Sequence, residues 1–220
     1  MLDAQVVKLD GSVIWASEEP DLLWALRGAG ANFGVVTKFK LQAVKYPQKV
    51  WAGPILISQK YLPEIAKGIS RMSDKQKMDP KVSLFVYLLK KEYLGFGEVD
   101  DDMIVLHVFD ALGEEHGRSD EAFGWALKLP GSVDHTEVKS LLGVSLMQER
   151  LSAVKGKMVS ELSSLSLTAL PEDLVLKAFD WFLQTRQHPE LNDATYVVFE
   201  LFCTVSSWLT NQRRRLNNEV

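Results

Sequence analysis

Residues 21–37 read DLLWALRGAGANFGVVT and combine three local patterns that decide the fold around them. The first six residues place three leucines on one side of a short helix, predicted from Asp21 to about Leu26. A glycine-rich turn is predicted over residues 27–34. A half-buried strand is predicted over Val35–Leu41, with regular alternation from Thr37. The stretch therefore predicts a helix, a turn and a strand in succession.

Upstream of this stretch, the sequence predicts a β-hairpin. Two runs rich in strand-forming residues, Val6–Leu9 and Val13–Ala16, are separated by Asp10-Gly11-Ser12. Asp-Gly is a strong hairpin signal because glycine reaches positive φ without a Cβ clash. The beginning of the chain is therefore expected to form a partial layer, in the order strand, strand, helix, loop, strand.

Downstream, predicted strands and helices alternate. The strands are expected at Trp51–Ser58, Val82–Leu89, Met103–Phe109 and Thr195–Phe202. Helices are expected where apolar residues repeat with a 3.6-residue period, over 61–72 and 171–182, and a third over Ser119–Leu127. Strands joined by such long connections predict an α+β fold, with an antiparallel sheet covered by helices on one face.

Three regions are expected along the chain. A boundary is predicted at Tyr46-Pro47-Gln48, which separates residues 1–46 from an α+β region over 47–204. Residues 205–220 have no apolar period and predict an irregular tail. Its three consecutive arginines are interpreted as a solvated terminus, with a nuclear signal or phosphate patch as the alternative.

Composition excludes several classes of function. The chain has 220 residues, with 25 Lys+Arg against 29 Asp+Glu, so no basic excess indicates nucleic acid as the main partner. No apolar run approaches the ~18 residues that span a membrane. The single cysteine, Cys203, excludes an internal disulfide, and no signal peptide is expected because Asp3 and Lys8 interrupt the N-terminal apolar residues.

The glycine loop allows two interpretations from the residues alone. Phe33 stands where a Gly-x-Gly-x-x-Gly fingerprint requires its third glycine, and a strand follows where that fingerprint requires a helix. A Rossmann site is therefore not expected. The loop either exposes successive N–H groups to an anion or makes a tight connection from helix to strand.

Asp10–Val13 together with residues 21–37 resembles the FAD-binding domain of the p-cresol methylhydroxylase type, within the vanillyl-alcohol-oxidase superfamily. More narrowly, the match resembles the berberine-bridge-enzyme-like FAD-linked oxidoreductases, and Val50–Pro54 looks like the family's entry into its substrate domain. Ala29 and Ala31 depart from the family's glycines. The resemblance implies that FAD is lined by Gly28, Gly30, Asn32, Phe33, Gly34, Val35 and Val36.

The resemblance also implies a function. Such enzymes oxidise an alcohol, sugar or amine and pass the electrons to O₂, and they are often secreted. In that family, an upstream half carries the pyrophosphate loop and the flavin-linked histidine, and a segment beyond about residue 205 carries the catalytic base. This chain is therefore expected to be a partial oxidoreductase with impaired or no activity. The alternative is a non-catalytic remnant that acts as a binding or assembly module.

Other polar residues give weaker indications. The four histidines lack a metal-ligand spacing, and Asp100–Asp102 lacks the frame of a calcium loop, so no metal is expected. His107 either lines a substrate cavity or is an ordinary hydrogen-bonded histidine. Glu200 is flanked by apolar neighbours and must face solvent, a partner or a cavity. Cys203 is expected to be a small buried hydrophobe, and no catalytic residue is assigned.

Overall fold

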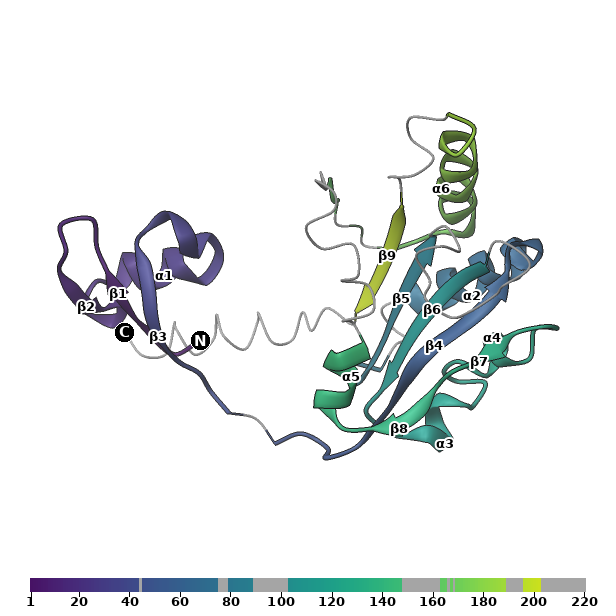
Figure 1. Ribbon diagram of the computed structural model, residues 1–220, viewed down its shortest axis with the longest axis horizontal. Helices are drawn as coiled ribbons and strands as arrows, with labels where there is room; N and C mark the ends of the chain where they lie inside the picture. The colour runs from purple at the N-terminus through teal and green to yellow at the C-terminus, as the bar shows by residue number, and fades with distance from the viewer. Residues whose placement is uncertain are drawn as a thin grey trace. The chain divides into compact units, whose positions relative to one another are not determined.

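A computed structural model describes residues 1–43, 45–74, 79–88, 103–147, 163–165, 167, 169–188 and 196–202. The chain divides into two compact units, Met1–Tyr46 and Pro47–Val220, which are described separately below (Figure 1). The expected positions of Asp100–Asp102, Cys203 and the 205–220 tail lie outside the described residues.

The first unit is a three-stranded antiparallel sheet with one helix. Its elements are β1 (Asp3–Val7), β2 (Val13–Trp15), α1 (Pro20–Ala29) and β3 (Val35–Lys40), and the strand order is β2-β1-β3. Strand alternation turns Ala4 and Val6 toward α1, where they pack with Ala16, Leu22 and Leu26. Among the described residues of this unit, no helix packs on the opposite face of the sheet.

The second unit contains a six-stranded antiparallel sheet. Strands β4 (Val50–Ser58), β6 (Met103–Asp110), β5 (Val82–Leu88) and β9 (Val197–Phe202) lie next to one another in this order. Two short strands, β7 (Val133–Asp134) and β8 (Glu137–Lys139), pair with the free edge of β4. Every strand pair is antiparallel, so the expected α+β fold class is confirmed.

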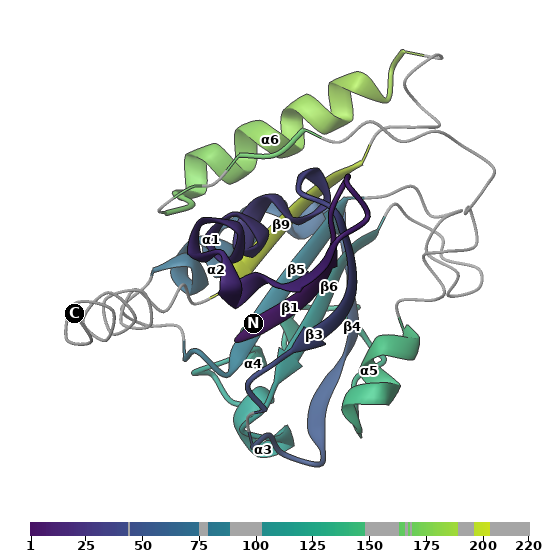
Figure 2. The ribbon, with the colours of Figure 1, turned by 90° about the vertical axis from the view of Figure 1, so that its left-hand side faces the viewer.

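Helices cover one face of this sheet. Helices α2 (Leu62–Ser73) and α6 (Glu172–Thr185) pack against each other and against alternate residues of β4, β5, β6 and β9. Trp51, Ile65, Phe123 and Phe179 are among the largest buried side chains of this core. In two views, α5 (Leu141–Met147) lies apart from α2 and α6 (Figures 1 and 2).

The hairpin differs from the expectation by a shift of its first strand. β1 begins at Asp3 and ends at Val7, rather than covering Val6–Leu9. The backbone N–H of Lys8 donates to the Ser12 carbonyl, and the N–H of Gly11 donates to the Lys8 carbonyl. These bonds make Lys8 and Leu9 part of the turn.

The helix expected over Ser119–Leu127 is wrong in its extent. The chain forms two short helices instead, α3 (Glu114–Gly117) and α4 (Gly124–Leu127). Gly124 lies so close to the Arg118 and Ser119 carbonyls that a Cβ there would be 2.7–2.8 Å from them. A folded-back turn therefore interrupts the helix. Strands β7 and β8 and helix α5 were not expected, because they are short.

Candidate functional site

The first candidate site is the loop between α1 and β3. Residues Gly30–Asn32 form one turn of 3-10 helix directly after α1, and β3 begins at Val35. Asn32 is exposed, Phe33 is 45% exposed and Val35 is 68% exposed. Val36 is directed instead toward α1 and packs against the small core. The loop therefore presents an apolar strip together with one side-chain amide.

The glycines of this loop have different structural roles. Gly34 has φ +133°, and a Cβ there would lie 2.6 Å from the Val7 carbonyl oxygen and 2.8 Å from Val6 Cγ1. The pairing of β1 with β3 thus already requires glycine at this position. A Cβ on Gly28 or Gly30 would meet no atom within 4 Å. These two positions are open, so a ligand can approach their backbone closely.

The electrostatic surroundings of the loop favour an uncharged group. The loop follows the C-terminus of α1, which carries the negative end of the helix dipole and disfavours a phosphate there. The nearest basic side chain in that last turn, Arg27, donates to the Met1 carbonyl at 3.2 Å. The exposed strip therefore fits a planar or apolar part of a nucleotide cofactor better than its pyrophosphate.

A second candidate region lies on the face of the large sheet opposite α2 and α6. Alternation along β5 places Phe85 and Tyr87 on this face, and the register sets Phe85 opposite His107 of β6. The Phe85 and Tyr87 rings are stacked 6.3 Å apart, and the His107 ring meets Tyr87 edge-on at 5.3 Å. This aromatic cluster was missed from the sequence, although the strict alternation of residues 82–88 could have indicated it.

His107 is held neutral by its surroundings. Burial, with the nearby Lys139 ammonium as a smaller contribution, lowers the pKa of His107 from 6.5 to about 4. Lys139 itself is only 12% exposed and forms an ion pair with Glu137 at 2.7 Å. Near neutral pH, the imidazole therefore offers one hydrogen-bond donor and one acceptor, but no charge.

Glu200 lies on the same face as His107. The register places Glu200 of β9 opposite Phe85, and its side chain is exposed. His116 lies elsewhere: its Nδ1 is 2.6 Å from Oδ2 of the fully buried Asp110. Among the described residues, no three His, Cys, Asp or Glu side chains cluster closely enough to hold a metal ion.

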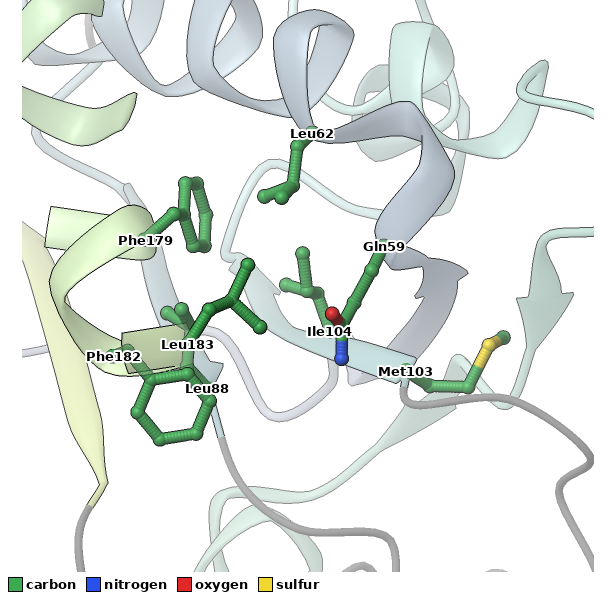
Figure 3. A pocket seen from close by; sticks show the side chains of 8 residues that line it. All are labelled: Gln59, Leu62, Leu88, Met103, Ile104, Phe179, Phe182 and Leu183. Carbon is green, nitrogen blue, oxygen red and sulfur yellow. The ribbon is translucent and has the colours of Figure 1, made fainter. Parts of the chain in front are cut away.

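One small pocket belongs to the core and not to a site. It lies between α2, α6 and the sheet (Figure 3), and its lining is almost entirely apolar: Gln59, Leu62, Leu88, Met103, Ile104, Phe179, Phe182 and Leu183. Its volume is about 10 Å³, room for a single water molecule at most. This cavity is therefore a packing defect too small for a substrate.

Comparison with known proteins shows which proteins this chain resembles. No family model matches the chain. The curated relatives include FAD-linked oxidoreductases and oxidases. One is an FAD-linked oxidoreductase of Aspergillus terreus that is 45% identical over 53 residues, 23% of this chain and 11% of that protein. The relatives that this chain resembles over this short stretch are thus named as FAD-linked oxidoreductases and oxidases.

Two further relatives are oxidases whose names state their substrates. The (R)-6-hydroxynicotine oxidase of Paenarthrobacter nicotinovorans is 49% identical over 55 residues, which are 24% of this chain and 12% of that enzyme. The xylooligosaccharide oxidase of Thermothelomyces thermophilus is 42% identical over 67 residues, 30% of this chain and 14% of the enzyme. These matches span only a small share of each relative.

Solved structures extend the likeness to most of the chain. A 6-hydroxy-D-nicotine oxidase from Arthrobacter nicotinovorans matches with a TM-score of 0.51 and 26% identity, over 70% of this chain and 33% of that one. The berberine-bridge-enzyme-like protein 1 of Physcomitrella patens matches with a TM-score of 0.60 and 16% identity, over 92% of this chain and 43% of that one. The second likeness concerns the fold alone. The chain thus spans less than half the length of both proteins.

Proposed function

We propose that this chain forms part of an FAD-dependent oxidase. In this proposal, residues 1–46 are the C-terminal part of the flavin-binding domain and residues 47–204 are a substrate domain. The cofactor is lined by Gly28, Gly30, Asn32, Phe33, Gly34, Val35 and Val36. The observation that carries the assignment is the exposed apolar strip of Phe33 and Val35 beside the open backbone of Gly30.

The proposed role of the loop is to hold an uncharged part of the cofactor. The aromatic ring of Phe33 and the Val35 side chain offer contact area, and the Asn32 amide offers a hydrogen-bond donor and an acceptor. FAD, when bound, supplies hydride acceptance and reoxidation by O₂. The protein's contribution at this loop is to bind and orient the cofactor.

We propose a small-molecule substrate, an alcohol, a sugar or an amine, on the sheet face that carries Phe85, Tyr87 and His107. Stacked aromatic rings suit the apolar side of a sugar or a heterocycle. Neutral His107 suits hydrogen bonding to a hydroxyl or amine, and the Glu200 carboxylate suits a cation. The names of the relatives, a nicotine oxidase and a xylooligosaccharide oxidase, support this range.

The loop assignment is tested in a chimera. Residues 21–41 of this chain replace the corresponding stretch of the (R)-6-hydroxynicotine oxidase, and flavin retention after gel filtration is read from absorbance. Gly30→Leu is expected to reduce retention at least about tenfold, because its side chain occupies the space of the cofactor without straining the helical backbone. Lys38→Leu, on the same strand beyond the loop, is the matched control.

Unchanged flavin retention in the Gly30→Leu chimera would contradict the loop assignment. Gly34 is a poor position for this test, because any side chain there also disrupts the pairing of β1 with β3.

We further propose that this chain alone binds FAD weakly and does not turn over substrate. The loop offers contacts from one side only, and loss of ~4 kcal/mol of contacts weakens binding about a thousandfold. Titration with FAD, followed by flavin fluorescence, is expected to show no saturation near 1 μM, and peroxide release with xylobiose should stay at background. A dissociation constant of about 1 μM would contradict this proposal. A purified chain that keeps a yellow flavin band would contradict it as well, whereas a colourless chain fits both this proposal and a non-catalytic binding module.

A further inference from the structure

Residues 133–139 contribute two very short strands to the free edge of β4 in the large sheet. β7 has two residues and β8 has three, and both pair with β4. Between them the chain lies against Gly53, where a Cβ would be 2.6 Å from the His135 carbonyl oxygen. Strands this short have little stability of their own, so the position of this segment depends on contacts made by its side chains.

Arg118 makes such contacts with all three nitrogens of its guanidinium group. Its Nε donates to Glu114 Oε1 at 2.8 Å, its Nη1 to Asp134 Oδ2 at 2.7 Å and its Nη2 to Thr136 Oγ1 at 3.3 Å. Asp134 ends β7 and Thr136 directly precedes β8, whereas Glu114 begins α3. The guanidinium therefore joins α3 to both short strands.

The same guanidinium also contacts β4 itself. Its Cζ lies over the ring of Trp51, 5.5 Å from the ring centroid. Trp51 is the residue of β4 that pairs with Val138, the middle residue of β8. Arg118 is thus anchored at the position of β4 that pairs with the centre of β8. A lysine cannot replace these contacts, because it lacks the planar fork that stacks and donates in several directions.

β8 brings an ion pair to the sheet face that carries His107. Glu137 and Lys139 flank Val138, so strand alternation turns both side chains to the face opposite Val138. Lys139 Nζ is 2.7 Å from Glu137 Oε1, and the Lys139 side chain is only 12% exposed. Burial first, and then the nearby Lys139 ammonium, lower the pKa of His107 to about 4. The placement of β8 therefore affects the surroundings of the imidazole.

We infer that Arg118 is a positioning residue for the sheet face that carries His107. By holding the ends of β7 and β8, it fixes β8 against β4 and so keeps the Glu137–Lys139 ion pair close to the imidazole. This arrangement keeps His107 in place and uncharged for hydrogen bonding. The inference rests on the proposed function where it treats this face as the substrate site, whereas the coupling of Arg118 to His107 rests on the contacts of Arg118 and β8.

The test is an NMR titration of the His107 imidazole in the full chain and in two Arg118 variants. Arg118→Lys is expected to raise the pKa of His107 by at least about 0.5, because β8 shifts and the imidazole gains water and loses the nearby ammonium. This variant keeps the positive charge, so loss of a cation does not account for the rise. Arg118→Gln is expected to raise the pKa by at least as much.

Lys128→Gln is the matched control. Lys128 follows α4, and its ammonium pairs with the exposed Asp120 at 2.5 Å. Removing this exposed cation is expected to leave the pKa of His107 unchanged to within about 0.1. Amide hydrogen exchange gives a second measurement. In Arg118→Lys, the amides of β8 are expected to exchange at least about tenfold faster, whereas the amide of Leu84 in β5 keeps its original rate.

A double-mutant cycle with Lys139→Met tests the route through β8. In the Lys139→Met background, Arg118→Lys is expected to raise the pKa of His107 by less than about half of its effect in the original chain. An equally large rise in both backgrounds would show that Arg118 acts by another route and would overturn the inference. An unchanged pKa of His107 in both Arg118 variants would also overturn it, even if both variants were less stable, because Arg118 would then be a structural contact only.

The outcomes separate this inference from the proposed function, with xylobiose as the probe. If xylobiose shifts no resonance of Phe85, Tyr87 or His107 but Arg118→Lys raises the pKa of His107, the positioning role is supported and the substrate face is contradicted. If xylobiose shifts these resonances and Arg118→Lys leaves the pKa unchanged, the substrate face is supported and the positioning role is overturned.

Discussion

The neutral state of His107 makes a measurable contribution to stability. Its pKa is about 4 in the folded chain against an ordinary 6.5, so the unfolded chain binds more protons between these two values. The contribution of His107 to the free energy of unfolding is therefore fully present above pH 6.5. It falls by on the order of 3 kcal/mol as the pH drops toward 4. Urea unfolding at pH 7.5, 6 and 4.5 measures this slope, and the imidazole resonances give the pKa directly.

His107→Gln is expected to flatten the part of this slope between pH 6.5 and 4. His188→Gln, at an exposed position, is the control substitution. A resonance of His107 that titrates near 6.5 would disprove the neutral buried state.

Gly34 and Gly30 are expected to respond to alanine in opposite directions. Gly34→Ala forces a Cβ to within 2.6 Å of the Val7 carbonyl oxygen at a positive φ, which costs about 2 kcal/mol or more. Gly30→Ala places its methyl in open space on a helical backbone and stabilises the unit by about 0.5 kcal/mol. Hydrogen exchange at the Val6 and Val36 amides reports both effects. Equal exchange rates in the two variants would contradict the assignment of Gly34 to the β1–β3 pairing.

At the scale of elements, periodicity predicted the long strands and helices well. β4 contains all of the predicted Trp51–Ser58, because it is an almost continuous run of buried residues. The apolar stripe predicted most of α2, because that helix buries one face. The helix before the glycine loop runs further than expected, to Ala29, since Gly28 has a helical backbone and no tight contact. Short elements such as β8 depend on tertiary pairing with β4, which local sequence does not encode.

The candidate sites also differ in whether local sequence or tertiary pairing brings their residues together. The glycine loop stands out in the sequence because its residues are contiguous, and its role in lining FAD stays a prediction. The cluster of Phe85, Tyr87 and His107 joins two strands, and its assembly depends on the register of β5 with β6. A single sequence does not give that register. The sequence therefore indicated His107 and Glu200 only as separate candidate residues.

Asp110 fixes the connection between β6 and α3. Its carboxylate is fully buried; Oδ1 accepts the Leu112 N–H at 2.8 Å, and Oδ2 lies 2.6 Å from Nδ1 of His116. Asp110→Ala leaves the Leu112 N–H and the His116 imidazole without the carboxylate. It is expected to lower the free energy of unfolding by about 3 kcal/mol. Asp120→Ala removes an exposed pair with Lys128 and should cost about 0.5 kcal/mol or less. Thermal or urea unfolding measures both effects. An equal decrease in the free energy of unfolding for the two variants would show that Asp110 does not stabilise this turn.

At the scale of the whole molecule, the two units differ greatly in the size of their cores. The main cluster of the second unit contains 21 buried apolar residues, whereas the cluster of the first unit contains five. Among the described residues, no helix combines the length and apolar character needed to cross a bilayer. The larger cluster gives the second unit the larger intrinsic stability.

Limited proteolysis tests this difference. Lys45 and Lys49 are exposed and lie in a stretch without regular secondary structure between the units, whereas Lys177 lies within α6. Among these three sites, trypsin is expected to cut at Lys45 or Lys49 before Lys177, because cleavage requires an extended, accessible backbone. The first unit should then be degraded faster than the sheet of the second unit, since fewer buried contacts oppose its local opening. Mass spectrometry of a time course identifies the products. Early cleavage after Lys177, or survival of the first unit beyond the second, would contradict this order of stability.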